Sequence, residues 1–189
     1  MNIPLCVDMD GTLIKGDTLW VSMRHLIQNN PLNGLGISWQ FATRGRAIMK
    51  EWMSARSIPK PEILPYHTDV YQWLIQEEAT GRELILVTGA HRLIAERVAA
   101  YTGLFKDIIA TENGYNMSGF PKAQALSKKF GEGGYDYAGN SPVDIPVWRY
   151  ARHIIIVNAS KRVSQKAHTL GIVEKEFSRP LETCYGLGK

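Results

Sequence analysis

The sequence predicts an α/β fold in which a parallel sheet carries helices on both faces, with a small helical cap inserted after the first strand. Short apolar runs, each ending in small or polar residues, alternate with helical stretches. Such runs are typical of strands buried on both faces, and their alternation with helices favours parallel pairing. The expected strands are Pro4–Val7, Glu83–Val87, Asp107–Ala110, Tyr135–Ala138 and His153–Val157. The expected helices are Pro65–Glu78, His91–Tyr101, Lys122–Phe130, Pro142–Tyr150 and Lys161–Leu170.

The segment 16–61 interrupts this alternation. It has helical character over Thr18–Gln28 and Trp39–Ala55, without a strand candidate, and Pro31–Gly34 predicts a turn between the two helices. The Pro59–Pro61 segment marks the expected return to the core. We therefore predict a core formed by residues 1–15 and 62–189 and a helical cap formed by residues 16–61. Residues 178–189 have too little pattern to be assigned.

The composition is that of a folded protein with one core and a modest insertion. With 189 residues, 44% hydrophobic and 21% charged, the chain falls in the ordinary globular range. The net charge of +4 suits an anionic ligand, but the sequence lacks the basic stripe of a nucleic-acid binder, so we expect no nucleic-acid partner. The longest apolar runs are far too short to span a membrane. Cys6 and Cys184 are expected to be reduced thiols in a cytoplasmic protein.

Two carboxylates follow the first predicted strand directly. In Val7-Asp8-Met9-Asp10-Gly11-Thr12, the chain turns as the strand ends, so both side chains can face one pocket. Adjacent carboxylates repel each other unless a cation offsets their charge, and hard oxygen ligands favour Mg²⁺. The simpler interpretation is a strand end with two solvated acids and a glycine turn.

Three further segments place polar side chains just after predicted strands or at helix starts. Thr88 and Gly89 follow the second strand, where a hydroxyl and backbone amides suit a phosphate oxygen, although Thr88 alone also suits a helix cap. Lys122 stands at the start of a predicted helix, where a positive charge is locally unfavourable. An anionic partner would explain a lysine at this position. Asn140 follows the strand ending at Ala138, and Asp144 lies one helical turn further on, so both can reach one ion.

Together these segments resemble the four motifs of the haloacid dehalogenase-like (HAD) superfamily, in its phosphatase branch. The resemblance rests on Asp8–Thr12, Thr88, Lys122 and Gly139–Asp144 in this order, and it covers the whole predicted core. It implies a Rossmann-like sheet, a C1-type cap similar to that of phosphoserine phosphatase-like members, Mg²⁺ as cofactor and a small phosphorylated substrate. Asp10 distinguishes the chain from dehalogenases, which lack it, and from phosphonatases, which usually have alanine there.

The resemblance also implies catalytic roles. Asp8 would be the nucleophile that forms an aspartyl-phosphate, and Asp10 would protonate the leaving oxygen and then activate water. Thr88, Gly89 and Lys122 would hold the phosphoryl oxygens, with Lys122 also offsetting charge near Asp8.

The last motif departs from the usual pattern. The resemblance implies a Mg²⁺ site formed by Asp8, the Asp10 backbone carbonyl, Asn140 and Asp144, but Asn140 stands where the family usually has an acid. Its amide offers an oxygen without a negative charge, which predicts weaker metal binding. Three functions stay open. They are a phosphomonoester hydrolase, a phosphotransferase or mutase, which shares the first half-reaction, and, because of Asn140, a non-catalytic phosphate-binding or regulatory module.

Three phrases resemble more specifically the HAD-like domain joined to UbiA-type membrane prenyltransferases. They are Tyr137–Ser141, Asp144–Arg149 and Val157–Ala159. The resemblance implies that an asparagine at position 140 is usual in that group. This resemblance implies a prenyltransferase as partner and a phosphorylated isoprenoid or sugar carrier as substrate.

Basic and apolar residues are mixed in the predicted cap. An amphipathic face that meets an anionic lipid surface is one interpretation, and a solvated helix with an ordinary apolar side is the one we expect. The residues concerned are Arg44, Arg46, Lys50 and Arg56 with Trp39, Phe41, Trp52 and Met53.

Overall fold

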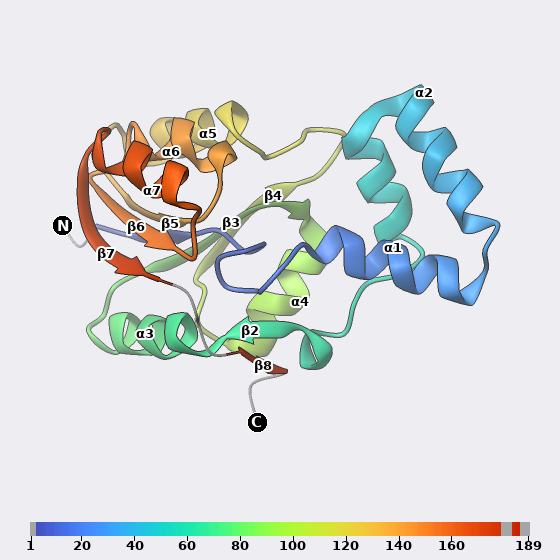
Figure 1. Ribbon diagram of the computed structural model, residues 1–189, viewed down its shortest axis with the longest axis horizontal. Coiled ribbons are helices and arrows are strands. Elements are labelled where there is room, and N and C mark those ends of the chain that lie inside the picture. The colour runs from blue at the N-terminus through green and yellow to red at the C-terminus, as the bar shows by residue number, and fades with distance from the viewer. Residues whose placement is uncertain (1–2, 179–182, 186–189) are drawn as a thin grey trace.

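The chain folds around a six-stranded parallel sheet. The structure, a computed structural model, describes residues 3–178 and 183–185, and side chains are described for all of these except 46, 47 and 183–185. The strand order is β4-β3-β1-β5-β6-β7, so β1 lies between β3 and β5 (Figure 1). The strands are β1 (Leu5–Val7), β3 (Leu84–His91), β4 (Asp107–Thr111), β5 (Asp136–Gly139), β6 (His153–Val157) and β7 (Ile172–Phe177). The predicted α/β fold with a parallel sheet is confirmed.

Helices cover both faces of this sheet, because alternate residues of the strands are buried on opposite sides. Leu5, Val7 and Leu86 belong to one apolar cluster, and Cys6 and Ile85 belong to another. Helices α3 (Thr68–Ala79) and α4 (Arg92–Thr102) pack on the first cluster. Helices α5 (Phe120–Phe130), α6 (Ile145–Trp148) and α7 (Lys161–His168) pack on the second, across the sheet from α3 (Figure 1).

Several predicted boundaries were wrong. The predicted helix Pro65–Glu78 begins as strand β2 (Pro65–His67), because this segment bonds to the loop after β1 and pairs antiparallel with β8 (Thr183–Tyr185). Strand β3 continues to His91, four residues beyond the predicted Val87. The predicted helix Pro142–Tyr150 is a 3₁₀ turn, η2 (Pro142–Asp144), followed by the single-turn α6. Strand β7 was not predicted, because its residues Glu174, Lys175 and Glu176 interrupt any apolar run.

Two helices form the cap region that follows β1. They are α1 (Thr18–Asn29) and α2 (Asn33–Ser54), and the short 3₁₀ turn η1 (Pro61–Ile63) leads back to β2. Helix α2 is broken at Gly45, whose φ of 80° is outside the helical range. Leu26, Ile37, Met49 and Met53 form a small core between the helices. The division of the chain at residues 16 and 61 stays a prediction.

None of the described helices is long and apolar enough to cross a membrane. Cys6 is a free, buried thiol in β1. The side chain of Cys184 lies outside the described residues, so the predicted state of that cysteine stays a prediction.

Candidate active site

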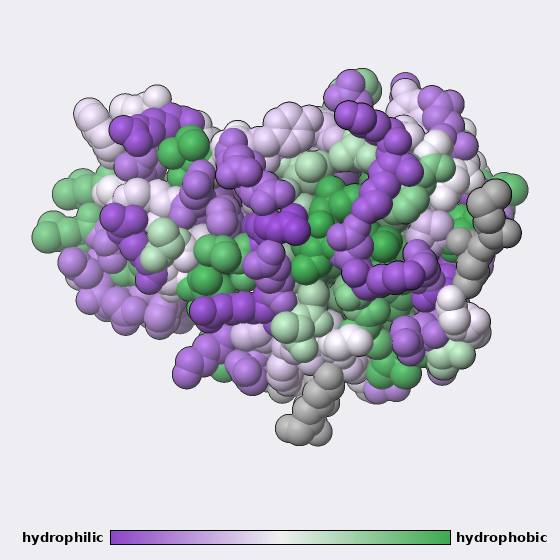
Figure 2. All heavy atoms as spheres, turned by 180° about the vertical axis from the view of Figure 1, so that it is seen from behind, coloured by the Kyte–Doolittle hydropathy of each residue, from purple (hydrophilic) through white to green (hydrophobic). Residues whose placement is uncertain are grey.

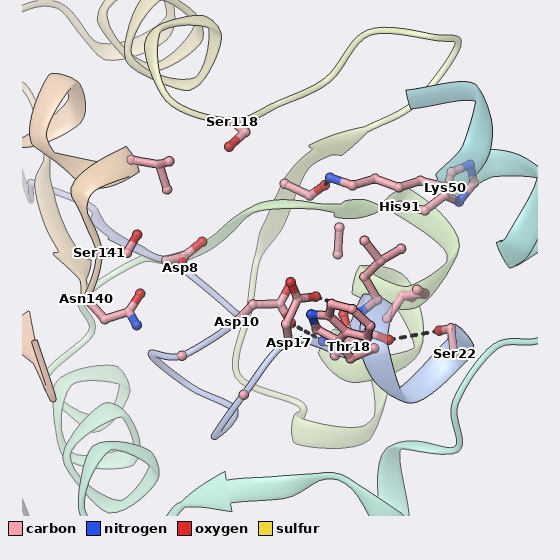
Figure 3. A pocket seen from close by; sticks show the side chains of 18 of the residues that line it. Asp8, Asp10, Asp17, Thr18, Ser22, Lys50, His91, Ser118, Asn140 and Ser141 are labelled. Carbon is pink, nitrogen blue, oxygen red and sulfur yellow. Dashed lines mark hydrogen bonds between the residues drawn. The ribbon is translucent and has the colours of Figure 1, made fainter. Parts of the chain in front are cut away.

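A cavity of about 900 Å³ lies at the carboxyl ends of β1, β3 and β5, beneath the cap. In parallel α/β sheets this edge is where ligands bind. Among the predicted site residues, Asp8, Asp10, Gly89, Lys122 and Asn140 line it. Figure 3 shows Asp8, Asp10 and Asn140 around this cavity. The cap contributes further lining residues from both of its helices: Leu19, Trp20, Ser22, Lys50, Met53 and Ser54.

A chain of four buried polar groups runs from the cavity into the core. Lys122 Nζ donates to Asp8 Oδ1 over 2.7 Å and to the Tyr137 hydroxyl over 2.8 Å. The hydroxyl of Tyr137 in turn donates to Asp144 Oδ1 over 2.8 Å. Lys122 Nζ also lies 3.7 Å from Asp144 Oδ1, so one ammonium is shared between two carboxylates. The arrangement fixes the position of Lys122 beside Asp8.

Burial and charge act in opposite directions on this pair. Burial raises the pKa of Asp8 above its ordinary value, while Lys122 acts to lower it. Burial also disfavours the charged form of Lys122, but Asp8 and Asp144 outweigh that effect, and the pKa of Lys122 is raised. Lys122 is therefore a permanent cation at neutral pH, available to a negatively charged group beside Asp8.

Asp10 is held by the first turn of the cap. Its Oδ1 accepts a hydrogen bond from the backbone N–H of Thr18 over 2.8 Å, and Asp17 caps the same helix by accepting from the N–H of Leu19. Burial, followed by the charge of Asp17, raises the pKa of Asp10 to about 6. A carboxyl group with this pKa can both give and take a proton near neutral pH.

Asn140 presents an unsatisfied oxygen to the cavity. Its Oδ1 is buried, and no hydrogen-bond donor among the described residues reaches it. A buried carbonyl oxygen without a donor is costly unless a cation or water binds it. Since Asn140 lines the same cavity as Asp8, its oxygen fits a hard cation such as Mg²⁺.

Asp144 holds the loop that carries Asn140. Its Oδ2 accepts from the backbone N–H groups of Asn140 and Ser141, at 3.1 and 3.0 Å, and from the Ser141 hydroxyl at 2.9 Å. With Tyr137 on its other oxygen, the carboxylate is fully buried and does not line the cavity. Asp144 therefore orients this loop, and its direct contact with a metal ion stays a prediction.

Thr88 and Gly89 lie within the extended β3, before the start of α4. Thr88 is fully buried, and its Oγ1 accepts from the N–H of Ala90 over 3.0 Å. Gly89 lines the cavity, and a Cβ atom at this position would lie 3.3 Å from Ser118 Cβ. The glycine thus leaves room between β3 and the loop before α5. Thr88 itself does not line the cavity, although the next residue does, so the contact of Thr88 with a phosphoryl group stays a prediction.

Sequence reasoning missed two residues that organise the site. Tyr137 lies inside a predicted strand, where an apolar position is the default expectation, so its hydroxyl gave no signal. Lys50 was considered only as a cap cation, yet it is buried and its Nζ donates to the Gly89 carbonyl and, over 3.1 Å, to Asn116 Oδ1. Lys50 thereby connects α2 to the end of β3 across the cavity.

A second acidic group lies at the opposite ends of the strands. Asp136, His153 and Glu174 come close enough together to hold a metal ion. However, both oxygens of Asp136 already accept hydrogen bonds from Arg152, and Arg82 also donates to it. Buried Asp136 is thus the centre of an ion-pair network, and two guanidinium groups leave it little capacity for a cation.

Comparisons with known proteins agree with this geometry. The family model for "haloacid dehalogenase-like hydrolase" matches residues 5–149. An uncharacterized protein of Sinorhizobium fredii, y4nM, is 29% identical over 179 residues, which are 94% of this chain and 34% of that protein. The chain thus spans about a third of the length of this relative.

Solved structures show the same fold. Phosphoserine phosphatase in its apo form has a TM-score of 0.64 at 12% identity, covering 95% of this chain and 94% of that one. A phospho-aspartyl intermediate analogue of phosphoserine phosphatase has a TM-score of 0.60 at 12% identity, covering 94% of both chains. Because the family model spans most of the chain, and the predicted motif residues Asp8, Asp10, Lys122 and Asn140 meet in one cavity of this fold, the chain belongs to the haloacid dehalogenase-like hydrolases.

Proposed function

We propose that the protein is a Mg²⁺-dependent phosphomonoester hydrolase that works through an aspartyl-phosphate on Asp8. One observation supports this most directly: the Asp8 carboxylate, the Lys122 ammonium and the unsatisfied Asn140 oxygen converge in the same cavity. A phosphoryl group placed there meets a nucleophile and a cation. Phosphoryl transfer depends mainly on such positioning and charge neutralisation.

The first half-reaction uses Asp8 and Asp10. An oxygen of Asp8 attacks phosphorus, the bond from phosphorus to the ester oxygen breaks, and the protonated Asp10 gives its proton to that leaving oxygen. Lys122 offsets the negative charge on the phosphoryl oxygens. Asp10 is suited to the role because its pKa of about 6 keeps a fraction of the group protonated near neutral pH.

The second half-reaction returns the enzyme to its starting state. The ionised Asp10 takes a proton from water, the water oxygen attacks the phosphorus of the aspartyl-phosphate, and phosphate leaves Asp8. The bond from the Thr18 N–H holds the Asp10 carboxylate in place during both steps. The fold is similar to that of phosphoserine phosphatase in its phospho-aspartyl intermediate analogue, which supports this chemistry.

The metal site is proposed from oxygen atoms of three residues that line the cavity. Asp8, the backbone carbonyl of Asp10 and Asn140 Oδ1 would hold Mg²⁺, and the ion would supply charge neutralisation for the phosphoryl group when bound. Asn140 fits because its oxygen has no donor among the described residues. Asn140→Asp would add a negative charge and is expected to lower the Mg²⁺ concentration needed for half-maximal activity, whereas Asn140→Ala is expected to raise it. Equal Mg²⁺ dependence in the wild type and both variants would show that Asn140 does not bind the metal ion.

The main test is hydrolysis of a soluble aryl phosphate by the wild type and by Asp8→Asn. We expect turnover that EDTA abolishes and Mg²⁺ restores, and that falls by at least about 10³-fold in the variant. If both proteins show the same background, the non-catalytic phosphate-binding module replaces the enzyme. If product appears only with an added alcohol acceptor, a phosphotransferase replaces the hydrolase. Small phosphate esters and isoprenoid or sugar phosphates remain the candidate substrates, and the prenyltransferase partner stays a prediction.

A further inference from the structure

Exposed apolar side chains are concentrated in the cap. Among the described residues, twelve large apolar side chains are exposed, and six of them lie between residues 20 and 41. In Figure 2, hydrophobic side chains are visible at the outer end of the cap, interspersed with hydrophilic ones. The six residues are Trp20, Ile27, Leu32, Leu35, Trp39 and Phe41. By contrast, Met49 and Met53 are buried between the cap helices. The six exposed residues are therefore not part of the core that stabilises the cap.

The exposed residues form ordered rows on the two helices. On α1, Trp20, Arg24 and Ile27 are spaced i, i+4, i+7, which places them on one face of the helix. On the first half of α2, Leu35 and Trp39 have the spacing i, i+4 and line a shallow hollow with Gly36, Ser38 and Ala42. Leu32 lies in the connection between the helices. Two such rows on adjoining helices are more than the scattered apolar residues of an ordinary surface.

The cap also holds the net charge of the chain. Residues 16–61 contain six Lys and Arg residues against Asp17 and Glu51, a net charge of +4, which equals that of the whole chain and leaves the remainder neutral. Arg24, Arg44 and Arg56 are exposed. The fitting partner is therefore negatively charged at its surface and apolar beneath it. A second copy presenting the same cap would repel this one, since both carry the same charge.

We propose that the exposed side chains of Trp20, Arg24 and Ile27 on α1, of Leu32 in the connection, and of Leu35 and Trp39 on α2, together called the cap face, dock on an anionic lipid surface. Tryptophan suits the boundary between headgroups and acyl chains, and arginine suits the anionic headgroups. Basic residues close to such a surface each contribute to binding, and the contribution is weakened by salt.

Docking has a consequence for the active site. Trp20 is 65% exposed and also lines the catalytic cavity, so the cap face adjoins the cavity wall. A phosphate ester with an apolar tail in the lipid layer would then be held next to the site. This consequence rests on the proposed function, whereas docking itself does not.

Vesicle binding tests the docking with the whole chain. We expect cosedimentation with vesicles of phosphatidylcholine mixed with phosphatidylglycerol, weakening as salt is raised, and much less with phosphatidylcholine alone. Arg24→Glu and Trp39→Ser are each expected to weaken binding about tenfold. Matched controls are Arg162→Glu, an exposed arginine on α7, and Ile172→Ser on β7, which is 66% exposed like Trp39. Both controls should bind as the wild type does.

Other outcomes would overturn the proposal. Equal binding to the two vesicle types, or loss of binding in the controls as much as in the cap variants, would exclude a specific cap face. A concentration-dependent dimer that Trp39→Ser abolishes, without vesicle binding, would make the face a contact between copies. Thermal melting followed by circular dichroism checks that the variants fold. If Trp39→Ser does not fold, the binding of Arg24→Glu decides the test.

Activity measurements separate this proposal from the proposed function. Trp39→Ser should lower hydrolysis of a long-chain alkyl phosphate in anionic vesicles while leaving hydrolysis of a soluble aryl phosphate unchanged. If the wild type hydrolyses neither substrate, the proposed function fails and vesicle binding alone still decides the docking. If the variant hydrolyses both at wild-type rates, docking does not deliver substrate.

Discussion

Asn140 occupies the space in which a side chain on Gly11 would lie. A Cβ atom at Gly11 would fall 2.1 Å from Asn140 Nδ2, far inside any allowed contact. The Gly11 backbone also has a φ of 81°, a conformation that L-residues rarely adopt. The turn after β1 and the loop after β5 are thus fitted to each other at the point where the proposed Mg²⁺ site lies.

Gly11→Ala is expected to displace Asn140 and lower turnover about 100-fold or more, with a higher Mg²⁺ requirement. The control is Gly81→Ala, where φ is 83° and a Cβ would meet nothing within 4 Å. That variant should lose about 1 kcal/mol of stability through backbone strain and keep its kinetics. Wild-type Mg²⁺ dependence in Gly11→Ala would show that the two loops do not constrain each other.

Tyr137→Phe is expected to weaken both catalysis and stability. Its hydroxyl accepts from Lys122 and donates to Asp144, so removal leaves both buried groups with one partner fewer. We expect unfolding to become easier by about 1–3 kcal/mol and kcat to fall about tenfold, measured by denaturant titration and steady-state kinetics. Tyr135→Phe is the control, because it removes another buried hydroxyl, which donates to the Val147 carbonyl away from the cavity. A fall in kcat that is equal in both variants would contradict the assigned role.

Asp10→Asn is expected to stabilise the metal-free protein at neutral pH while abolishing turnover. The folded-state pKa of Asp10, about 6, lies above the ordinary value of 3.8, so the folded protein holds the proton more tightly than the unfolded chain. The wild type therefore loses stability as the pH rises between these values, and the loss is complete above them. Asn keeps an oxygen for the Thr18 N–H but carries no charge. Thermal unfolding in EDTA should show a gain of about 3 kcal/mol near pH 8 that falls below about 1 kcal/mol near pH 4. A gain that is constant with pH would point to a cause other than ionisation.

Lys50→Met is expected to loosen the cap. Since Lys50 Nζ donates to the Gly89 carbonyl and to Asn116, its loss removes a polar connection between α2 and the core. We expect KM to rise about tenfold and the amides of α1 and α2 to exchange hydrogen faster, as read by mass spectrometry. Lys60→Met, at an exposed position near the end of the cap, is the control. Unchanged exchange in α1 and α2 would show that other contacts hold the cap.

Five strands of the sheet and the polar residues that follow them at the cavity were predictable because their signals are local. Apolar runs such as Leu84–Val87 must be buried, and the polar residues that follow them must meet at one edge. Other features depend on partners distant in the sequence. Strand β2 exists because Pro65–His67 pairs with segments that no local pattern identifies. The role of Tyr137 depends on which way an otherwise ordinary strand residue faces, and the role of Lys50 depends on how closely α2 approaches β3.

The hydrogen bond from Thr18 to Asp10 limits how this protein can be re-engineered. The residue proposed to move the proton takes its orientation from the first turn of the helix that opens the cap. A chimera that received another cap would therefore need to keep residues 10–19 intact, with the graft joined after that turn. The cap can be exchanged without loss of the proton transfer only if those residues are kept.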